Sequence, residues 1–351
     1  MYNMKTKHNY LVDIIKLLAA VMVILSHSFH LSSNTLDPVE SLTNGFLTFG
    51  GLAVAIFFTY SGYYVSKSLK KNDKEYIRKR AKRIFPELII VVLITIFIIG
   101  PIFTTKKMSD YFLNFRTYFY LLNAILIPYH NLPGVFLNNC YGPTVNGALW
   151  TLPVEFFCYI LLFILYKIYK NINKGKDKEK EEKGDYLIII SNVLLIIGLV
   201  VLKTCFSNLS ISQLAISAIR PIIVFLNAAY LSKYEKINKN LFIISLILLP
   251  TVFFIKNFYY INIVYCFLIP IALIGSLRFN IKENKIVSFL GESTYAMYLF
   301  GFVIQQSVVA IFGGQMLWYV NFIISAIVSI VLGCILNYLM IKLKSKYNFL
   351  K

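Results

Sequence analysis

Residues 11–29 read LVDIIKLLAAVMVILSHSF, a stretch long and apolar enough to cross the hydrocarbon of a bilayer as one helix. Similar, nearly uncharged blocks recur at residues 90–100, 187–202, 241–255 and 323–336. The 351 residues are 58% hydrophobic, with a mean hydropathy of +0.68, whereas a soluble chain has roughly 45–50% apolar residues. No strand-like alternation recurs along the chain, which leaves helices as the spanning elements. We therefore predict an all-α integral membrane protein.

The charge of the chain points to a membrane topology and not to nucleic acid. The formal net charge is +19, but the Lys and Arg residues fall between the apolar blocks, as they do in membrane proteins. We therefore expect membrane lipid and no nucleic acid as a partner. The first block has no evident cleavage site and carries Lys16 and His27, so we expect it to be a retained span and not a signal peptide. No Cys/His cluster has zinc-ligand spacing, and we predict no metal site.

The basic segments divide the apolar blocks into pairs. These segments lie at residues 1–7, 67–83, 167–183, 233–239, 278–285 and 342–351. If all are cytoplasmic, an even number of spans separates each neighbouring pair, and three candidate blocks compete between residues 83 and 167. We assign the weakest, residues 111–128, to a helix in or at the outer face, because spanning it would move the following lysine-rich loop outside.

The prediction is thus a single transmembrane domain over residues 1–351 with about ten helical spans and both termini cytoplasmic. Residues 171–185 are a low-complexity charged run, which predicts a disordered cytoplasmic loop.

Ionisable groups inside a bilayer are costly and indicate where function lies. Lys16 and His27 are eleven residues apart, which is three helical turns plus about 20°, so both lie on one helix face about 16 Å apart along the axis. This face would carry a cation in its inner half and a titratable base near its outer end. The alternative is a snorkelling lysine and a histidine hydrogen-bonded at the interface.

A basic cluster precedes the third predicted span. Arg78 and Arg80, with Arg83 nearby, occur in the segment RKRAKRIFPE. Such a cluster often serves only as a positive-inside anchor. A guanidinium group also binds phosphate oxygens bidentately, through two parallel hydrogen bonds. A phosphate clamp is therefore the second interpretation.

The segment NGALWTLPVE, residues 146–155, places Glu155 about one third of the way into the fourth predicted span. This carboxylate needs a partner. It either pairs with Arg220 in the sixth span or orients a histidine.

In the ninth predicted span, the polar residues Tyr295, Tyr298, Gln305 and Gln306 form a stripe. The stripe faces an interior cavity, or it serves ordinary hydrogen bonding between helices.

Five motifs together resemble the membrane-bound acyltransferase-3 family, which includes the O-antigen and exopolysaccharide O-acetylases. The first is VDIIKLLAAVMVILSHS with its basic residue, ten intervening residues and histidine, here Lys16 and His27. It is followed by FFTYSGYYVSKSL at residues 57–69, an Arg-x-Arg loop with a trailing Arg-Ile-x-Pro, NGALWTLPVEF, and a late LGESTYAMYLFGFVIQQ at residues 290–306. The motifs occur in the family's order and cover most of the chain.

The resemblance implies ten spans and transfer of an acyl group, usually acetyl, from cytoplasmic acyl-coenzyme A to a glycan or related acceptor. It implies His27 as the catalytic base, and Lys16 with the Arg78–Arg80 loop and Arg83 as coenzyme A contacts. Two positions depart from the family pattern. Lys16 stands where arginine is more usual, and Gly301-Phe302 stands where many members have a His-x-Pro element.

Residues and resemblance together predict a multi-pass enzyme of the inner cell membrane that moves acetyl from acetyl-CoA to a hydroxyl of a cell-surface glycan or lipid-linked sugar. We expect His27 and Glu155 to be catalytic, and Lys16, Arg78, Arg80 and Arg83 to bind acetyl-CoA. We expect the acceptor to be bound by Asn146, Trp150, Tyr295 and Gln305. The main alternative is a transporter or flippase of lipid-linked sugars, which should show helices broken at the midplane and often inverted repeats. A non-catalytic sensor or assembly partner of the same fold is a third class.

Overall fold

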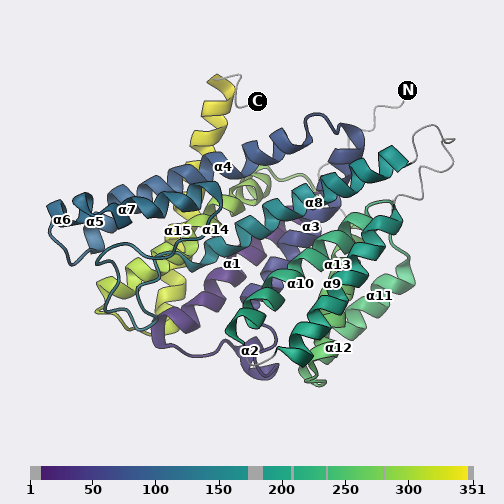
Figure 1. Cartoon of the computed structure of the whole chain (residues 1–351), viewed down its shortest axis with the longest axis horizontal. Coiled ribbons are helices and arrows are strands. Elements are labelled where there is room, and N and C mark those ends of the chain that lie inside the picture. Colours follow the sequence, from purple (N-terminus) through teal and green to yellow (C-terminus); the bar gives the residue numbers. More distant parts are fainter. Residues whose placement is uncertain (1–8, 173–184, 207–208, 235, 280, 347–351) are drawn as a thin grey trace. The chain divides into compact units, whose positions relative to one another are not determined.

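The computed structural model describes residues 9–172, 185–206, 209–234, 236–279 and 281–346. Over these residues the chain is helical, and its strand-like pairing consists of two isolated bridges, Thr104 with Val135 and Asn131 with Thr144. The helices form two compact units (Figure 1). The first unit comprises Met1–Ala53, Lys82–Trp150 and Leu277–Lys351, and the second comprises Val54–Ala81 and Thr151–Ser276.

Among the described residues, eight helices are long and apolar enough to cross a membrane. They are Tyr10–Ser33, Tyr76–Phe103, Gly147–Ile172, Tyr186–Cys205, Ile211–Leu231, Phe258–Arg278, Lys285–Ile311 and Trp318–Lys346. The other two predicted spans correspond to α3 (Phe49–Lys71) and to the shorter apolar run Lys239–Phe253. The all-α membrane fold is confirmed. The count of ten spans and the cytoplasmic position of the termini stay predictions.

In the first unit, α1 (Tyr10–Ser33), α14 (Lys285–Ile311) and α15 (Trp318–Lys346) pack against one another (Figure 1). Asn9 caps the start of α1, where its side chain accepts a hydrogen bond from the Leu11 amide and donates to the carbonyls of Leu277 and Phe279. The left-handed conformation of Asn34 ends the helix. The second half of α14 is buried on all sides, which explains why it is apolar around most of its circumference.

A π-turn interrupts a helical run that lies in the first unit from Lys82 onward. The run consists of α4 (Tyr76–Ile94), the π-turn η1 (Thr95–Ile99) and α5 (Gly100–Phe103). A π-turn leaves backbone carbonyls available, and here the Tyr111 hydroxyl donates to the carbonyl of Ile96 at 2.9 Å. Gly100 provides the space, since a Cβ there would lie 2.7 Å from the Tyr111 ring carbon Cζ.

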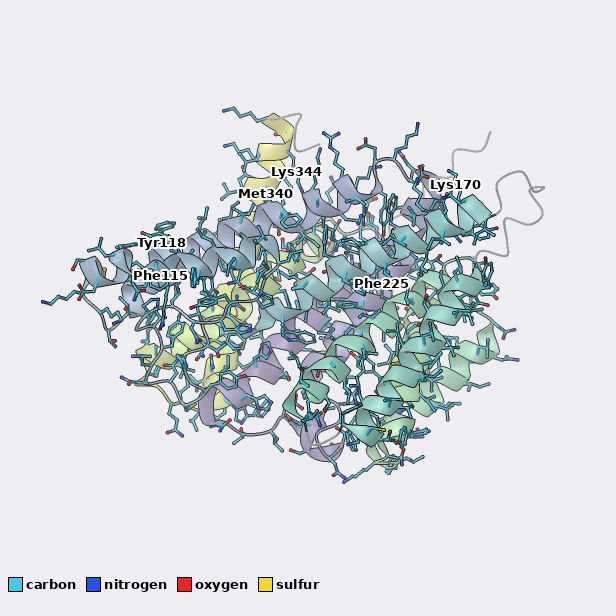
Figure 2. All side chains as sticks on the ribbon, viewed as in Figure 1. Phe115, Tyr118, Lys170, Phe225, Met340 and Lys344 are labelled. Atoms are coloured by element: carbon cyan, nitrogen blue, oxygen red, sulfur yellow. The ribbon has the colours of Figure 1, made fainter. Side chains whose placement is uncertain are left out.

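Residues 111–128, predicted as one helix at the outer face, are broken into short pieces. They are the end of α6 (Met108–Leu113), α7 (Phe115–Phe119) and η2 (Tyr120–Ile125). Asn114 ends α6 and caps α7 with its side chain, which accounts for the break. Each piece is too short to span a bilayer. Phe115 and Tyr118 on α7 are exposed (Figure 2), while the outer-face location stays a prediction.

The second unit contains most of α3 together with α8 (Thr151–Ile172), α9 (Asp185–Cys205), α10 (Ser210–Leu231), α11 (Lys239–Leu248), η5 (Leu249–Phe253), α12 (Phe258–Ile263), η6 (Val264–Leu268) and α13 (Ile269–Gly275). Phe225 on α10 (Figure 2) is fully buried. Its backbone lies so close to Gly62 of α3 that a side chain at position 62 would clash with it. Of the predicted disordered loop at 171–185, residues 173–184 lie outside the described residues, and α8 and α9 include its ends.

Candidate functional site

His27 lies on α1, where the helix packs against α14. Its imidazole is half-buried and meets the Phe302 ring edge to face, with 5.1 Å between ring centroids. Its Nδ1 is fully buried and has no hydrogen-bond partner among the described residues. A half-buried neutral imidazole is the kind of side chain that can take up a proton during a reaction.

Phe302 joins His27 to an irregular loop that precedes α8. The Tyr141 ring approaches Phe302 at 6.0 Å, and a Cβ added at Gly147 would lie 2.9 Å from two carbons of the Phe302 ring. Gly147 thus allows the loop to lie directly on this phenyl ring. Phe302 entered the sequence analysis only as a departure from a family motif, and no local pattern shows that it touches His27.

Lys16 occupies the other end of the same α1 face, as its spacing from His27 predicts. Its Nζ lies 3.6 Å from Asp13 Oδ1, and Asp13 itself is almost completely buried. The side chain of Asp13 fits against Gly291 of α14, where a Cβ would come within 2.6 Å of the Asp13 carboxyl carbon. Arg83 and Glu292 lie near enough for their charges to act on Lys16. This end of the helix therefore brings two predicted coenzyme A contacts, Lys16 and Arg83, into one electrostatic environment.

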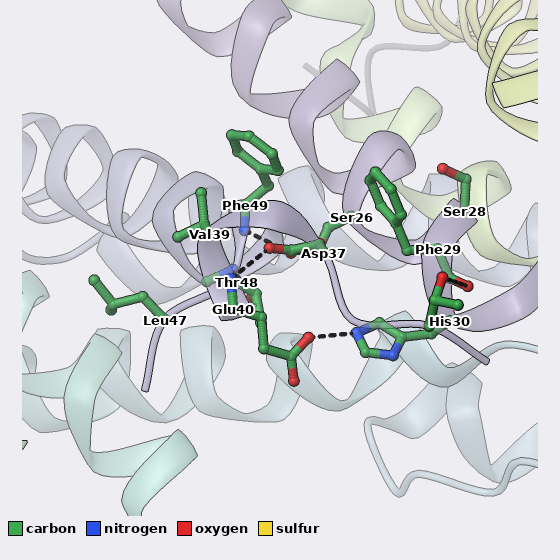
Figure 3. A network of polar contacts seen from close by, with 12 residues as sticks. Ser26, Ser28, Phe29, His30, Asp37, Val39, Glu40, Leu47, Thr48 and Phe49 are labelled. Atoms are coloured by element: carbon green, nitrogen blue, oxygen red, sulfur yellow. Dashed lines mark hydrogen bonds and ion pairs between the residues drawn. The ribbon is translucent and has the colours of Figure 1, made fainter. Parts of the chain in front are cut away.

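A polar network closes the C-terminal end of α1 (Figure 3). Asp37 is fully buried and accepts three hydrogen bonds, from Ser26 Oγ at 2.6 Å and from the backbone amides of Glu40 and Phe49. Next to it, His30 Nε2 lies 2.8 Å from Glu40 Oε2. This network fixes the chain that follows α1 and, through Ser26, the helix turn that carries His27.

The loop before α8 is held by side chains of α14. Asn139 donates from Nδ2 to the side chain and backbone oxygens of Gln306, and Gln306 donates from Nε2 to the carbonyls of Gly142 and Thr144. Tyr298 donates to the carbonyl of Ala148 at 2.6 Å. A segment without regular secondary structure is thus fixed by bonds between residues 150 to 167 positions apart.

Of the four predicted acceptor-binding residues, three have polar groups that are bonded inside the first unit. Asn146 is buried, donates to the carbonyl of Leu299 at 2.9 Å and accepts from the amide of Ala148. Tyr295 donates to the carbonyl of Ile84, and the fully buried Gln305 donates to the carbonyl of Ile24. Trp150 is half-buried at the end of η3 (Gly147–Trp150).

The second unit holds the remaining predicted residues. Tyr159 connects two of them: its hydroxyl donates to Glu155, and the Arg80 guanidinium lies 5.9 Å from the centre of its ring. Ser61 is hydrogen-bonded to Tyr159 at 2.9 Å and donates to Glu155 at 3.3 Å. The exposed Arg78 lies 3.7 Å from Glu75.

The hypothesis that Glu155 pairs with Arg220 is not what the contacts favour. The hydrogen bonds of Glu155 go to Tyr159 and Ser61, whereas Arg220 Nε donates to Asn262 at 2.6 Å. The carboxylate is thus held by hydroxyl groups. A carboxylate held in this way can still accept a proton or orient a histidine.

The sequence of this chain is similar to those of known proteins. Residues 9–341 match a family model described as an acyltransferase domain. The chain is 35% identical over 163 residues to an O-acetyl transferase of Shigella phage Sf6, which is 45% of this chain and 46% of that protein. It is 30% identical over 167 residues to nodulation protein 10 of Rhizobium leguminosarum bv. viciae, covering 45% and 44% of the two chains. The chain thus spans a little under half the length of the curated relatives it matches. No solved structure matches with comparable significance.

Proposed function

Because this chain belongs to the acyltransferase-3 family, whose model it matches from residue 9 to 341, we propose that it is a membrane-bound O-acyltransferase. The group transferred is acetyl, its donor is cytoplasmic acetyl-CoA, and its acceptor is a hydroxyl of a cell-surface glycan or related molecule. The name of the phage relative supports acetyl. The observation that carries the proposal is the α1 face, with Lys16 at one end and a half-buried His27 against Phe302 at the other.

In the proposed reaction, neutral His27 acts as the general base. It takes the proton of the acceptor hydroxyl while that oxygen attacks the thioester carbonyl carbon. The carbon–sulfur bond then breaks, and the imidazolium returns the proton to the leaving thiolate. The products are the O-acetyl ester and free coenzyme A, and the histidine ends in the state in which it began.

The donor is assigned to the basic end of the site. Lys16 and Arg83 belong to the first unit, and Arg83 is three residues after Arg80 on α4, so Arg80 and Arg83 lie on neighbouring positions of one helix face. The positive charges of Lys16 and Arg83 act on each other and repel. The phosphates of coenzyme A would relieve that repulsion. Arg78 is more exposed and would extend the same phosphate contacts.

Glu155 is proposed as the second catalytic group, acting through the hydroxyls of Tyr159 and Ser61 that it accepts from. The acceptor is assigned to the loop before α8. There Trp150 is half-buried, and Asn146, Tyr295 and Gln305 would shape the site from inside. The protein is proposed to lie in the inner cell membrane, with the acceptor approaching from the outer side.

The test is release of free thiol from acetyl-CoA by the purified protein in nanodiscs, in the presence of candidate glycan acceptors. We expect His27→Ala to lower the rate by about 10²- to 10⁴-fold, the usual contribution of a general base. His30→Gln changes another histidine of α1, one that pairs with Glu40, and is expected to retain most of the rate. Size-exclusion profiles and thermal unfolding would establish that both variants are folded.

Substantial thiol release by His27→Ala would refute the role of this histidine. If the wild-type protein neither binds acetyl-CoA nor releases thiol, a transporter of lipid-linked sugars becomes the better hypothesis. A binding measurement with acetyl-CoA alone separates that result from the case in which only the acceptor is missing.

A further inference from the structure

Three residues of α14 lie against the turn of α1 that carries His27. A Cβ at Gly301 would lie 3.3 Å from Ile24 Cγ1, the Phe302 ring contacts His27, and Gln305 Nε2 donates to the carbonyl of Ile24 at 2.7 Å. Positions 301 and 305 are one helical turn apart and share a face of α14. The close approach that glycine allows at 301 therefore brings the Gln305 amide to the backbone of α1.

The Gln305 amide lies at the height of His27 along the α1 axis. In an α-helix, each carbonyl points toward the C-terminus and accepts from the amide four residues later, so the Ile24 oxygen is directed toward the level of residues 27 and 28. The carbonyl oxygen of the Gln305 side chain is attached to the same carbon as the nitrogen that makes this bond. Both polar atoms of the amide thus lie next to the turn that includes His27.

Two buried polar atoms in this helix pair have no hydrogen-bond partner among the described residues. One is His27 Nδ1 and the other is Gln305 Oε1. Most buried polar atoms are paired, so an unpaired one calls for a physical reason. The two atoms are complementary, because an amide oxygen can only accept and an imidazole nitrogen donates in one of the two neutral tautomers.

The charged groups near His27 are already engaged. His30 and Asp37 are the two whose charges act on the imidazole. Asp37 already accepts from Ser26 and from two backbone amides, and His30 is paired with Glu40. A carboxylate of this network is therefore a poor candidate for orienting the ring, and the neutral amide of Gln305 is the better one.

We propose that Gln305 is a positioning residue for His27: its side-chain carbonyl accepts the Nδ1 hydrogen through one bridging water and thereby leaves Nε2 as the basic nitrogen. This inference rests on the proposed function for its role in the reaction. It changes the assignment of Gln305 from acceptor binding to orientation of the base. It also gives a reason for the fully buried glutamine in the middle of an apolar helix pair.

The experiment is nitrogen NMR of protein labelled with ¹⁵N-histidine in nanodiscs, because the shifts of the two ring nitrogens report the tautomer without any turnover. The His27 signals are assigned by their loss in His27→Gln. We expect wild-type His27 to carry its neutral-form hydrogen on Nδ1. We expect Gln305→Met to move the hydrogen toward Nε2, and Gln305→Glu, which keeps an acceptor oxygen, to retain the wild-type tautomer.

The matched control is Gln306→Met. Gln306 is the neighbouring buried glutamine, but its amide bonds the loop at Gly142 and Thr144, so its loss should leave the His27 tautomer unchanged. In thiol-release assays, Gln305→Met should lower kcat about 10- to 100-fold, the range known for partners that orient a functional histidine, with little change in KM for acetyl-CoA.

An Nε2–H tautomer in the wild type, or the same tautomer in Gln305→Met as in the wild type, would overturn the inference. If Gln305→Met does not fold, Gln305→Glu carries the test, and a tautomer change in that variant would also overturn it. Failure of the acyltransferase proposal would be seen in a different measurement, as the absence of thiol release by the wild-type protein. The two failures are therefore distinguishable.

Discussion

Gly291 is the point at which α14 allows Asp13 of α1 to lie between the two helices. Replacing this glycine by alanine adds a Cβ only 2.6 Å from the carboxyl carbon of Asp13 and 2.8 Å from its Oδ1. Asp13 is 2% exposed and is the ion-pair partner of Lys16, so its side chain has little room to turn away. The Asp13 Cβ lies closer still to the added carbon, and it is fixed to the backbone of α1. The substitution Gly291→Ala therefore has to move one helix away from the other.

The size of the movement follows from the contact distance. Ordinary carbon contacts begin at 3.4 Å, so the carboxyl carbon must retreat by about 0.8 Å at least, and the closer Asp13 Cβ must retreat further. Overpacking of this kind costs about 1–3 kcal/mol of stability. Misplacing a functional group by about 1 Å can reduce a catalysed rate about 100-fold, and Lys16 moves with Asp13. We therefore expect Gly291→Ala to lower both the stability of the protein and its rate of thiol release.

Gly198→Ala is the matched control, because a Cβ at that position of α9 has no atom within 4 Å. Alanine in an open helix position is slightly favourable relative to glycine, by about 1 kcal/mol at most. The assays are the midpoint of thermal unfolding in detergent and the KM for acetyl-CoA in thiol release. If Gly291→Ala matches Gly198→Ala in both measurements, the close packing of Asp13 on α14 does not govern the position of Lys16.

Two further predictions concern polar contacts outside the α1–α14 pair. Asp37→Ala leaves the buried Ser26 hydroxyl and two part-buried backbone amides without their acceptor, and we expect it to destabilise the protein by about 2–3 kcal/mol, measured by chemical unfolding. An unchanged stability would contradict the network of Figure 3. Hydrogen bonds from Lys167 and Lys170 lower the pKa of Asp73 below its ordinary value of 3.8. The ionised Asp73 therefore stabilises the folded protein at pH values above 3.8, and this contribution is lost as the pH falls through the lower folded-state pKa. The unfolding midpoint of Asp73→Asn should thus lie below that of the wild type at pH 7 and low salt, and the difference should shrink in strongly acidic buffer and in high salt. A difference that does not depend on pH would refute the ion pair as its source.

The spans were largely predictable from sequence because each long apolar block has few ways to satisfy its backbone in lipid. The block at residues 11–29 became α1, and the regular helix places Lys16 and His27 on one face as their spacing indicated. The continuity of other elements was not predictable. The π-turn within the third span accepts a hydrogen bond from Tyr111, a residue beyond the end of that helix, and apolar periodicity carries no sign of this contact.

The surroundings of the candidate base were beyond sequence reasoning for a different reason. Phe302 looks like any apolar residue of a buried helix, and its contact with His27 depends on how α14 crosses α1. Likewise, Tyr159 reads as a routine aromatic residue, although it links Arg80 to Glu155. These roles come from pairings between distant segments, and one sequence does not encode them locally.

The loop that Gln306 holds against α14 has a consequence for molecular recognition. Ordering a flexible residue costs about 1–2 kcal/mol of conformational entropy. Residues 139–144 are already fixed by the glutamine amide and by Asn139 before anything docks there. A molecule that binds against this loop therefore meets a preorganised surface, and its affinity reflects the match of shape and hydrogen bonds with no entropic penalty for freezing the loop.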